Sequence, residues 1–249
     1  MLNNKIAVIT DGSCDAGIAI SKKLLESGAA VILNNAPGVP PAGGYPGLLT
    51  AVSYDLTKFD GGEMLASFVR EKFGRADILI HSDNHVCEAS IEYMPEADFM
   101  RALEVNAKTA FVATRAFGAM MAEAGSGIIL YISSIHDEKA TGCAFSYSMA
   151  KGAVLMLMRE AALEYGPHGV KINLIETGGV AGDDTLFSGA DLSNLYTDMN
   201  ERMATGSPVT HEDLADYIAH YVSAPNPSLN GANIRLDGGF TLYYIGRQK

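Results

Sequence analysis

Short apolar runs alternate with longer helical segments along the whole chain, and no other feature limits the fold as strongly. Lys5–Thr10 (KIAVIT), Asp77–Ile80 and Val170–Ile175 have the compact, apolar character of buried strands. Helically spaced apolar residues occupy Ile18–Ser27 and Ser146–Tyr165. Buried strands separated by helices indicate βαβ units, whose crossovers are almost always right-handed. We therefore predict an α/β protein with a doubly wound parallel sheet in three αβα layers.

The rest of the pattern is typical of one domain spanning residues 1–249. No internal repeat, linker or low-complexity tract divides the sequence. The further expected strands are Ala30–Leu33, Leu49–Tyr54, Gly127–Ile132 and Ala232–Leu236, and the further expected helices are Glu63–Phe73, Glu96–Glu123 and His211–Val222. Residues 183–208 carry no strand signal and are expected to form a partly helical insertion.

Composition narrows the range of partners. The chain carries 18 Lys and Arg against 29 Asp and Glu, a net charge of −11, and 48 % of its residues are hydrophobic, which argues against disorder. A nucleic-acid partner is not expected, because phosphate contacts need clustered Lys and Arg and no basic run is present. No apolar stretch reaches the roughly 18 residues of a membrane span, and the first residues lack signal-peptide features, so no membrane contact is expected.

The cysteines indicate a reducing environment. Cys14, Cys87 and Cys143 are odd in number and widely spaced. Neither a disulfide framework nor a cysteine-based zinc site fits that spacing. We therefore expect a cytoplasmic protein.

The loop after the first expected strand, from Thr10 to Ala19, consists largely of small residues. Ligands of doubly wound sheets bind at the carboxyl ends of the strands, where small residues let a pyrophosphate approach backbone N–H groups at the start of a helix. The alternative is an ordinary turn between a strand and a helix. Asp11 and Asp15 count against phosphate binding, because a carboxylate repels a phosphate over about 4–6 Å. They could instead cap the helix or point away.

A second candidate feature is the pair formed by Tyr147 and Lys151. These residues are four apart and share one face of an expected helix, and Ser134 lies thirteen residues before Tyr147 at a strand end. An ammonium near a phenol favours the phenolate and lowers the phenol pKa from about 10, so that the tyrosine can exchange a proton with a substrate oxygen. A serine hydroxyl nearby can hydrogen-bond the same oxygen. The alternative is a surface Tyr–Lys pair without a role in chemistry.

With these residues the chain resembles the short-chain dehydrogenase/reductase superfamily over essentially its whole length. The family's motifs are matched by Tyr147-Ser148-Met149-Ala150-Lys151, by Ser134, by Asn106 in the preceding long helix, by Asp55-Leu56 after the third strand and by the closing Asp237-Gly238-Gly239. The resemblance implies a single Rossmann-like domain. It also implies an NAD(P)-dependent oxidoreductase that transfers hydride between a nicotinamide and an alcohol/carbonyl substrate.

The resemblance also implies roles for individual residues. Tyr147 would be the general acid/base, and Lys151 would lower its pKa and hold the nicotinamide ribose. Ser134 would orient the substrate oxygen, and Asn106 would support a water and Lys151 in a proton relay. The residues expected to contact the cofactor are Thr10, Gly12, Ser13, Gly17, Ile18, Asn34, Asn35, Asp55, Leu56, Ser82, Asn84, Tyr147, Lys151, Thr177, Gly178 and Val180.

The chain departs from the family pattern mainly where it would hold the dinucleotide. The loop after the first strand is two residues longer than usual, with Asp11 in place of the first glycine. His81-Ser82-Asp83-Asn84 replaces the usual Asn-Asn-Ala-Gly, and Thr177-Gly178 replaces Pro-Gly. Asn34-Asn35 offers neither an acid for a ribose hydroxyl nor an arginine for a 2′-phosphate. Because no Lys or Arg lies between Lys23 and Lys58, the sequence favours NAD over NADP.

The expected substrate contacts combine the catalytic residues with an apolar flap. Ser134, Tyr147 and His136 would face the reacting end of the substrate. The insertion at about 183–208 resembles the family's substrate flap, although a surface helix pair is the alternative, and its candidate lining residues are Leu186, Phe187, Leu195, Tyr196 and Met199. No metal is predicted, because a polar rim explains His81, Asp83, His85, His136 and Asp137 better than a ligand set.

The helix that carries Tyr147 is also expected to contact another subunit. Its continuation, Val154–Met158, is apolar nearly all round, which favours burial on two faces. The resembled family commonly forms tetramers through this helix and the helix carrying Asn106. We therefore expect a homotetramer or homodimer.

Two further functions stay open. An enoyl-thioester reductase of the same superfamily would explain the longer loop, but that branch spaces its Tyr and Lys further apart than Tyr147 and Lys151. A non-catalytic binding or regulatory protein with the same fold would explain Asp11, Asp15 and the replaced segment after the fourth strand.

Overall fold

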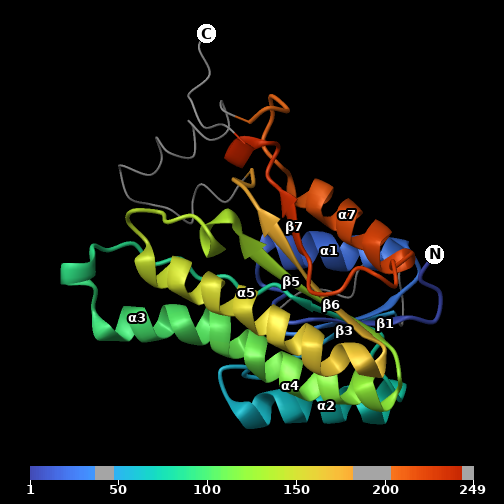
Figure 1. Cartoon of the computed structure of the whole chain (residues 1–249). Helices are drawn as coiled ribbons and strands as arrows, with labels where there is room; N and C mark the ends of the chain where they lie inside the picture. Colours follow the sequence, from blue (N-terminus) through green and yellow to red (C-terminus); the bar gives the residue numbers. More distant parts are fainter. Residues whose placement is uncertain (37–47, 182–202, 243–249) are drawn as a thin grey trace.

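The computed structural model describes residues 1–36, 48–181 and 203–242, and these form a seven-stranded parallel sheet (Figure 1). The spatial order of the strands is β3-β2-β1-β4-β5-β6-β7. The strands are β1 (Ile6–Ile9), β2 (Ala30–Leu33), β3 (Leu49–Ala51), β4 (Ile78–His81), β5 (Gly127–Ser134), β6 (Val170–Thr177) and β7 (Asn233–Leu236). The predicted fold class is confirmed.

Helices cover both faces of the sheet and bury an apolar core on each side (Figure 1). On one face α1 (Asp15–Glu26) and α7 (His211–Ser223) pack on the strands. On the other face α2 (Phe59–Phe73), α4 (Thr109–Glu123) and α5 (Phe145–Tyr165) do so. This is the expected three-layer arrangement, and it explains why the strands read as continuous apolar runs.

The ends of the helices follow from local sequence chemistry. Cys14 caps α1, because its sulfur accepts a hydrogen bond from the backbone N–H of Gly17. Gly74 ends α2 in the left-handed conformation at φ +78°, where a side chain would be strained. Thr210 and Asp213 form a reciprocal capping box at the start of α7. The short helical turns are η1 (Ile91–Tyr93), η3 (Ile135–Asp137), η4 (Gly166–His168) and η6 (Phe240–Leu242).

Two expected elements differ from the structure. The expected helix Glu96–Glu123 is divided into α3 (Glu96–Leu103), a π-helical segment η2 (Glu104–Lys108) and α4. The π segment holds Asn106, and such bulges are frequent at functional sites. The expected strand Leu49–Tyr54 ends early at Ala51.

The third strand is short because a side chain replaces its backbone partner. The amide of Asn34, just after β2, accepts a hydrogen bond from the Tyr54 N–H at 2.8 Å. The same amide donates to the Tyr54 carbonyl at 3.0 Å. These two bonds satisfy the Tyr54 backbone without a further strand residue. Other boundaries differ by a few residues, including β5 and β6, which each run two residues further than expected.

The strand order places a ligand site at the carboxyl edge of the sheet. The chain leaves β1 toward β2 and β3, then returns to pair β4 with the other side of β1. The loops after β1 and β4 therefore diverge at this point, and such a topological switch is where doubly wound sheets bind ligands.

Candidate active site

Two adjoining cavities lie at the carboxyl edge, and Asn84 lines both of them. The first, of about 90 Å³, is lined by residues at the ends of β4, β5 and β6 and at the starts of α1 and α7. The second, of about 420 Å³, is lined by residues at the ends of β1 to β4 and by α3, η2 and the start of α4. We call these the catalytic cavity and the adenosine cavity, after the roles that the sequence resemblance implies for their lining residues.

Ser134, Tyr147 and Lys151 all line the catalytic cavity. Ser134 is the last residue of β5, while the other two lie on the first turns of α5. Tyr147 is 5 % exposed and Lys151 only 2 %. The Nζ of Lys151 lies 5.5 Å from the centroid of the Tyr147 ring. The structure thus brings together the three residues that the sequence spacing predicts.

Backbone carbonyls hold the buried ammonium of Lys151 in place. Its Nζ donates to the carbonyl of Asp83 at 3.5 Å and to that of Ile132 at 3.4 Å. A buried charge needs such partners, because it has lost its water shell. The two carbonyls belong to the end of β5 and the loop after β4, so the ammonium lies where these strand ends meet.

Asn106 is fully buried in the π segment and fixes the loop after β4. Its amide accepts from the backbone N–H of His85 at 3.1 Å and donates to the His85 carbonyl at 2.7 Å. A third bond goes to the Ala102 carbonyl at 2.9 Å. The side chain is therefore a support for the loop that carries Asp83 and Asn84.

The loop after β1 turns the carboxylate of Asp11 toward the end of β2. Its Oδ1 accepts from the Ser13 backbone N–H at 2.9 Å, from the Ser13 hydroxyl at 2.6 Å and from the Asn35 amide at 3.0 Å. Asn35 adopts the left-handed conformation at φ +50°, which asparagine tolerates better than most residues. Asp15 is exposed in the first turn of α1, where the negative charge of a carboxylate interacts favourably with the positive end of the helix dipole.

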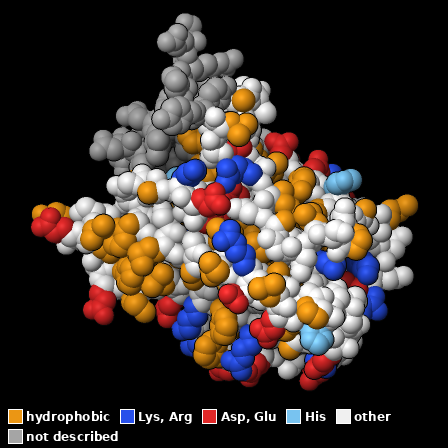
Figure 2. All heavy atoms as spheres, viewed as in Figure 1, with side chains coloured by type: hydrophobic (Ala, Val, Ile, Leu, Met, Phe, Trp, Pro, Cys, Tyr) orange, Lys and Arg blue, Asp and Glu red, His pale blue; other side chains and the backbone are white. Residues whose placement is uncertain are grey.

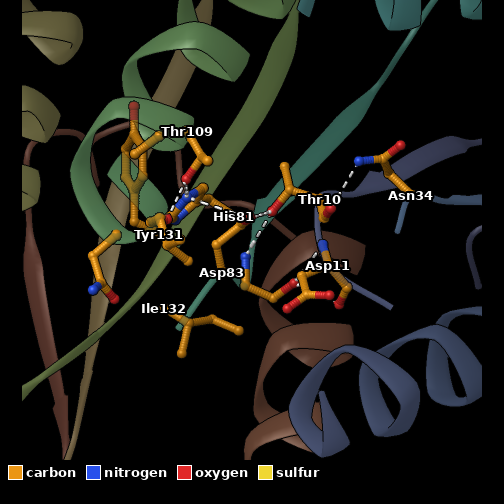
Figure 3. A network of polar contacts seen from close by, with 12 residues as sticks. Thr10, Asp11, Asn34, His81, Asp83, Thr109, Tyr131 and Ile132 are labelled. Atoms are coloured by element: carbon orange, nitrogen blue, oxygen red, sulfur yellow. Dashed lines mark hydrogen bonds and ion pairs between the residues drawn. The ribbon is translucent and has the colours of Figure 1, made fainter. Parts of the chain in front are cut away.

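A buried polar network joins the ends of β1 and β4 (Figure 3). Thr10 hydrogen-bonds the carboxyl group of Asp83, and the Thr10 hydroxyl also accepts from the Ser82 N–H at 3.0 Å. The Nε2 of His81 lies 2.9 Å from the Thr109 hydroxyl and 3.5 Å from Asp83 Oδ2. Figure 3 shows Asp83 directed at Thr10 between the two strands.

Burial favours the neutral form of both titratable groups of this network. It raises the pKa of Asp83 to about 7, an effect that Asp11 adds to and the Thr10 hydrogen bond opposes. Burial also lowers the pKa of His81 to about 3, and the Lys151 charge acts in the same direction. Below about pH 7 the network therefore adds little negative charge beside the loop after β1.

Most of the predicted cofactor residues line one of the two cavities. Those in the catalytic cavity are Ser82, Asn84, Tyr147, Lys151, Thr177, Gly178 and Val180. Those in the adenosine cavity are Thr10, Ser13, Asn34, Asn35, Asp55, Leu56 and Asn84. The amide of Asn34 is occupied by the backbone of Thr10 and Tyr54, so Asn34 shapes the cavity without offering a donor.

Gly12, Gly17 and Ile18 line neither cavity. The two glycines permit close packing instead: a Cβ on Gly17 would lie 1.9 Å from the Asp11 carbonyl oxygen, and one on Gly12 would lie 2.4 Å from Leu33. Ile18 is 44 % exposed on α1. The two glycines therefore shape the backbone of the loop, and their predicted contact with the cofactor stays a prediction.

The predicted substrate contacts are described only in part. His136 packs edge-on against the Tyr147 ring at 6.4 Å between centroids, and its Nδ1 lies 2.9 Å from the Lys139 carbonyl. It does not line the catalytic cavity. Leu186, Phe187, Leu195, Tyr196 and Met199, with most of the expected flap, lie outside the described residues.

The structure adds cavity residues that sequence reasoning missed. Arg101 of α3 lines the adenosine cavity, and His211 at the start of α7 lines the catalytic cavity. His211 lies far in sequence from the motifs and Arg101 lies five positions before Asn106, and neither has a spacing signal that would have found it. His211 alone had a weak clue, since it opens a helix next to the capping residue Thr210.

These residues fit a dinucleotide. Small residues at the start of α1 bring a helix N-terminus onto the catalytic cavity, whose lining includes Cys14, Asp15 and Ala16. Such a terminus presents N–H groups and a positive dipole end to an anion. The adenosine cavity offers hydroxyl and amide groups beside Leu56 and Val105.

In the described ranges no group of three or more metal-ligating side chains is assembled. No helix among the same residues has the length and apolar character needed to cross a membrane.

Comparisons with known proteins find likenesses over nearly the whole chain. A family model described as enoyl-(acyl carrier protein) reductase matches residues 15–241. L-rhamnose 1-dehydrogenase (NAD(P)+) of Azotobacter vinelandii is 27 % identical over 254 residues, covering 96 % of this chain and 97 % of that protein. D-beta-hydroxybutyrate dehydrogenase of Rhizobium meliloti is 28 % identical over 258 residues, covering 95 % and 98 %. A gluconate 5-dehydrogenase structure from Burkholderia cenocepacia, in complex with NADP and tartrate, aligns with a TM-score of 0.87 at 22 % identity over 97 % of both chains.

Proposed function

The chain belongs to the short-chain dehydrogenase/reductase superfamily, and on this premise we propose that Tyr147 is its general acid/base. The protein is an oxidoreductase for hydride transfer between a nicotinamide cofactor and an alcohol/carbonyl substrate. The bound nicotinamide supplies or accepts the hydride. The observation that carries the residue assignment is the meeting of Ser134, Tyr147 and Lys151 on one cavity.

Each of these residues has one task in the proposed mechanism. The Tyr147 hydroxyl gives a proton to the substrate oxygen during reduction and takes it back during oxidation. Lys151 stabilises the phenolate through its nearby positive charge. Ser134 donates a hydrogen bond that orients the same oxygen. Asn106 holds the loop after β4, and through it the carbonyl of Asp83 that accepts from Lys151.

We also propose that NAD is preferred over NADP. Asp11 and Asp55 both line the adenosine cavity, and Arg101 is the one Lys or Arg among its described lining residues. Asn35 holds the Asp11 carboxylate at the end of β2, where a dinucleotide fold places the adenosine ribose. A 2′-phosphate there would meet a negative charge, whereas a ribose hydroxyl could donate to it.

Fluorescence titration tests cofactor binding directly. The chain has no tryptophan, so reduced nicotinamide can be followed against a low protein background. We expect saturable binding of NADH that is tighter than that of NADPH. Turnover is then measured by NADH oxidation with a panel of ketones, aldehydes and sugars. Absence of saturable binding by both cofactors would reject the oxidoreductase function, and tighter NADPH binding would reject only the preference.

An enoyl-thioester reductase is a second candidate, favoured by the description of the matching family model and by the longer loop after β1. The four-residue spacing of Tyr147 and Lys151 opposes it. A short enoyl thioester added to the same panel separates the two. Faster NADH oxidation with the thioester than with every carbonyl compound would establish the second candidate.

A homo-oligomer built on α4 and α5 is the proposed assembly. Phe111, Met149, Met156 and Leu163 are apolar, lie on these helices and are 44 %, 53 %, 51 % and 75 % exposed. Figure 2 shows apolar patches on the face where these helices lie. Large exposed apolar areas are typical of subunit contacts. Sedimentation should give a dimer or tetramer, and Met156→Glu with Leu163→Glu should give a monomer.

A cytoplasmic location is proposed on the chemistry of the cysteines. Cys14, Cys87 and Cys143 are all unpaired in the structure. Free thiols are typical of a reducing compartment. Fractionation of cells that express the tagged protein would test this.

A further inference from the structure

A compact group of charged side chains lies directly behind Ser134. Glu176 of β6 is completely buried, and in the sheet register it lies between Ser133 of β5 and Arg235 of β7. Side chains in register on neighbouring strands project from the same face of a sheet. Asp137, from the turn η3 that follows β5, joins this row through a hydrogen bond from the Ser133 hydroxyl to its Oδ2 at 2.8 Å.

Arg235 neutralises only part of the negative charge in this group. Its Nε donates to Glu176 and its Nη2 donates to Glu138 Oε2 at 2.8 Å. The Asn233 amide donates to the other oxygen of Glu176 at 3.0 Å. The group therefore contains three carboxyl groups and one guanidinium. Arg235 binds Glu176 and Glu138, and it makes no ion pair with Asp137.

The Oδ1 of Asp137 is buried and has no hydrogen-bond donor among the described residues. An ionised oxygen in that position would be costly, because burial removes its water. A proton on it could instead be donated to Glu176. Accordingly, burial first and the neighbouring Glu176 second raise the pKa of Asp137. Burial opposes ionisation of Glu176 too, but the hydrogen bonds from Arg235 and Asp137 outweigh it and lower the Glu176 pKa.

Among the described residues, no ion pair joins Asp137 to a Lys, Arg or His. Glu138 follows it in the loop, and His136 precedes it with its ring against Tyr147. On the α5 side, a Cβ on Gly152 would lie 3.5 Å from the Asp137 carbonyl oxygen, and glycine carries no charge. The charged groups known to interact with the pair are Arg235, which bonds Glu176, and Glu138, which adds to the raised pKa of Asp137.

We propose that Asp137 and Glu176 share one proton, and that the protonated pair positions Ser134 and the Thr177-Gly178 loop. The proton resides on Asp137 and is donated to the carboxylate of Glu176. When it is released to water, the two adjacent carboxylates repel each other and the link between the ends of β5 and β6 weakens. The pair is a positioning element and does not touch the reacting atoms.

The geometry explains how this pair reaches the catalytic cavity. Ser133 and Asp137 close a turn that contains Ser134, whose Oγ accepts from the His136 N–H at 3.3 Å. Glu176 directly precedes Thr177, and the Thr177 hydroxyl donates to the Ser133 carbonyl at 3.0 Å. Two strand ends that line the cavity are therefore fixed from behind by the same carboxyl pair. Its role in catalysis rests on the proposed function, whereas the shared proton does not.

Infrared spectroscopy tests the shared proton without cofactor or substrate. The wild-type protein should show the carbonyl stretch of a protonated carboxyl group that disappears as pH rises through the pKa of Asp137, about 8. Asp83 contributes a second such signal, so the assignment uses the difference between wild type and Asp137→Asn. That variant should lose one signal, while Asp98→Asn, at an exposed position on α3, should lose none. An unchanged spectrum in Asp137→Asn would refute the proposal.

Hydrogen exchange tests the positioning. Asparagine copies the neutral acid, because its amide can donate to Glu176 and its oxygen can accept from Ser133. After correction for intrinsic rates, exchange in the segment 133–139 should accelerate several-fold in wild type between about pH 6 and about pH 9. It should stay slow in Asp137→Asn and be fast at both pH values in Asp137→Ala. Equal pH dependence in wild type and Asp137→Asn would overturn the positioning role, even if NADH binds as proposed.

A serine variant separates the proton from the link. Ser133→Ala removes the hydroxyl that connects Asp137 to the turn but leaves the carboxyl pair intact. It should keep the infrared signal, whereas hydrogen exchange in the segment 133–139 should be fast at both pH values. Loss of the infrared signal in this variant would contradict the assignment of the proton to the Asp137–Glu176 pair. Because Ser133→Ala leaves Asp137, Glu176 and Arg235 in place, it also covers the case in which Asp137→Ala fails to fold.

Discussion

The two cavities of this cleft differ in how closely they follow the family pattern. In the catalytic cavity Ser134, Tyr147 and Lys151 keep the expected residues and spacing, and the departures in its lining, such as Ser82, Asn84 and Thr177, lie among the expected cofactor contacts. In the adenosine cavity Asp11, Asn35 and Asp83 replace expected residues, and each is held by hydrogen bonds within the protein. Proton transfer needs given atoms at given places, whereas a ribose or adenine can be held by many combinations of polar groups. The chain therefore varies where recognition is adaptable.

The largest effect should come from the catalytic cavity. Tyr147→Phe removes the hydroxyl to which we assign the proton exchange and should lower kcat by about 10²–10⁴-fold, the usual contribution of a general acid/base. NADH affinity should change little, since the ring remains. Tyr165→Phe makes the same change at the far end of α5 and should keep full turnover. Steady-state kinetics with the best substrate of the panel measures both, and turnover unchanged in Tyr147→Phe would exclude the assigned role.

Two glycine substitutions compare how tightly the backbone is packed in the loop after β1 and in α5. Gly17→Ala should lower the free energy of unfolding by roughly 1–3 kcal/mol, because its Cβ would lie 1.9 Å from the Asp11 carbonyl oxygen and the loop must shift. Gly152→Ala, in α5, has room at 3.5 Å and should raise it by up to about 1 kcal/mol, since alanine is the better helix former. Urea unfolding measures both. Equal effects would show that the loop after β1 is less tightly packed than its contacts indicate.

Changing the charge of Asp11 should alter the balance between the two cofactors. Asp11→Asn keeps the shape but removes the negative charge beside Asn35, and it should shift the ratio of NADPH to NADH affinity by about tenfold toward NADPH. Asp15→Asn, at the exposed start of α1, provides the matched control and should shift it much less. Fluorescence titration gives the four dissociation constants. A ratio that moves equally in both variants would mean that general charge, and not Asp11, sets the preference.

The smallest effect concerns the pH dependence of Asp83. Its pKa is raised from 3.8 to about 7, so its contribution to folding stability is complete below 3.8 and is lost as pH rises through 7. Above that pH its ionised carboxylate also repels the cofactor phosphates, so the NADH dissociation constant should rise a few-fold between about pH 6 and about pH 8. Asp83→Asn should remove this rise. Titration at several pH values checks it, and an identical rise in the variant would assign it elsewhere.

Sequence reasoning predicted the elements that depend on local pattern. The apolar runs gave the strands, and the spacing of Tyr147 and Lys151 on one helix indicated a shared site. It missed the end of the third strand, because Asn34 satisfies the Tyr54 backbone across twenty residues. It also missed the π segment, since the apolar period continues through Glu104–Lys108 while the hydrogen-bond register changes.

The candidate site shows the same division. Sequence reasoning left open whether the carboxylate of Asp11 opposes a phosphate, caps the helix or points away, because charge alone gives no direction. The structure gives that direction through Ser13 and Asn35. Likewise, Glu176 and Asp137 are 39 positions apart in the chain, and only the pairing of β5 with β6 brings them together. Directions and long-range contacts depend on the assembled sheet, which no local pattern contains.

The strand order also determines the order in which strands can pair while the chain is being synthesised. β1 can pair with β2 early, but its other neighbour is β4, and Ala7 must wait for Ile78. β5 in turn cannot complete its edge until β6 has been made. Domains fold as units while the ribosome adds residues one by one, and distant pairings form slowly. The described lining residues of the adenosine cavity all lie between Thr10 and Thr109, whereas those of the catalytic cavity extend to Leu214, so the first set is synthesised long before the second is complete.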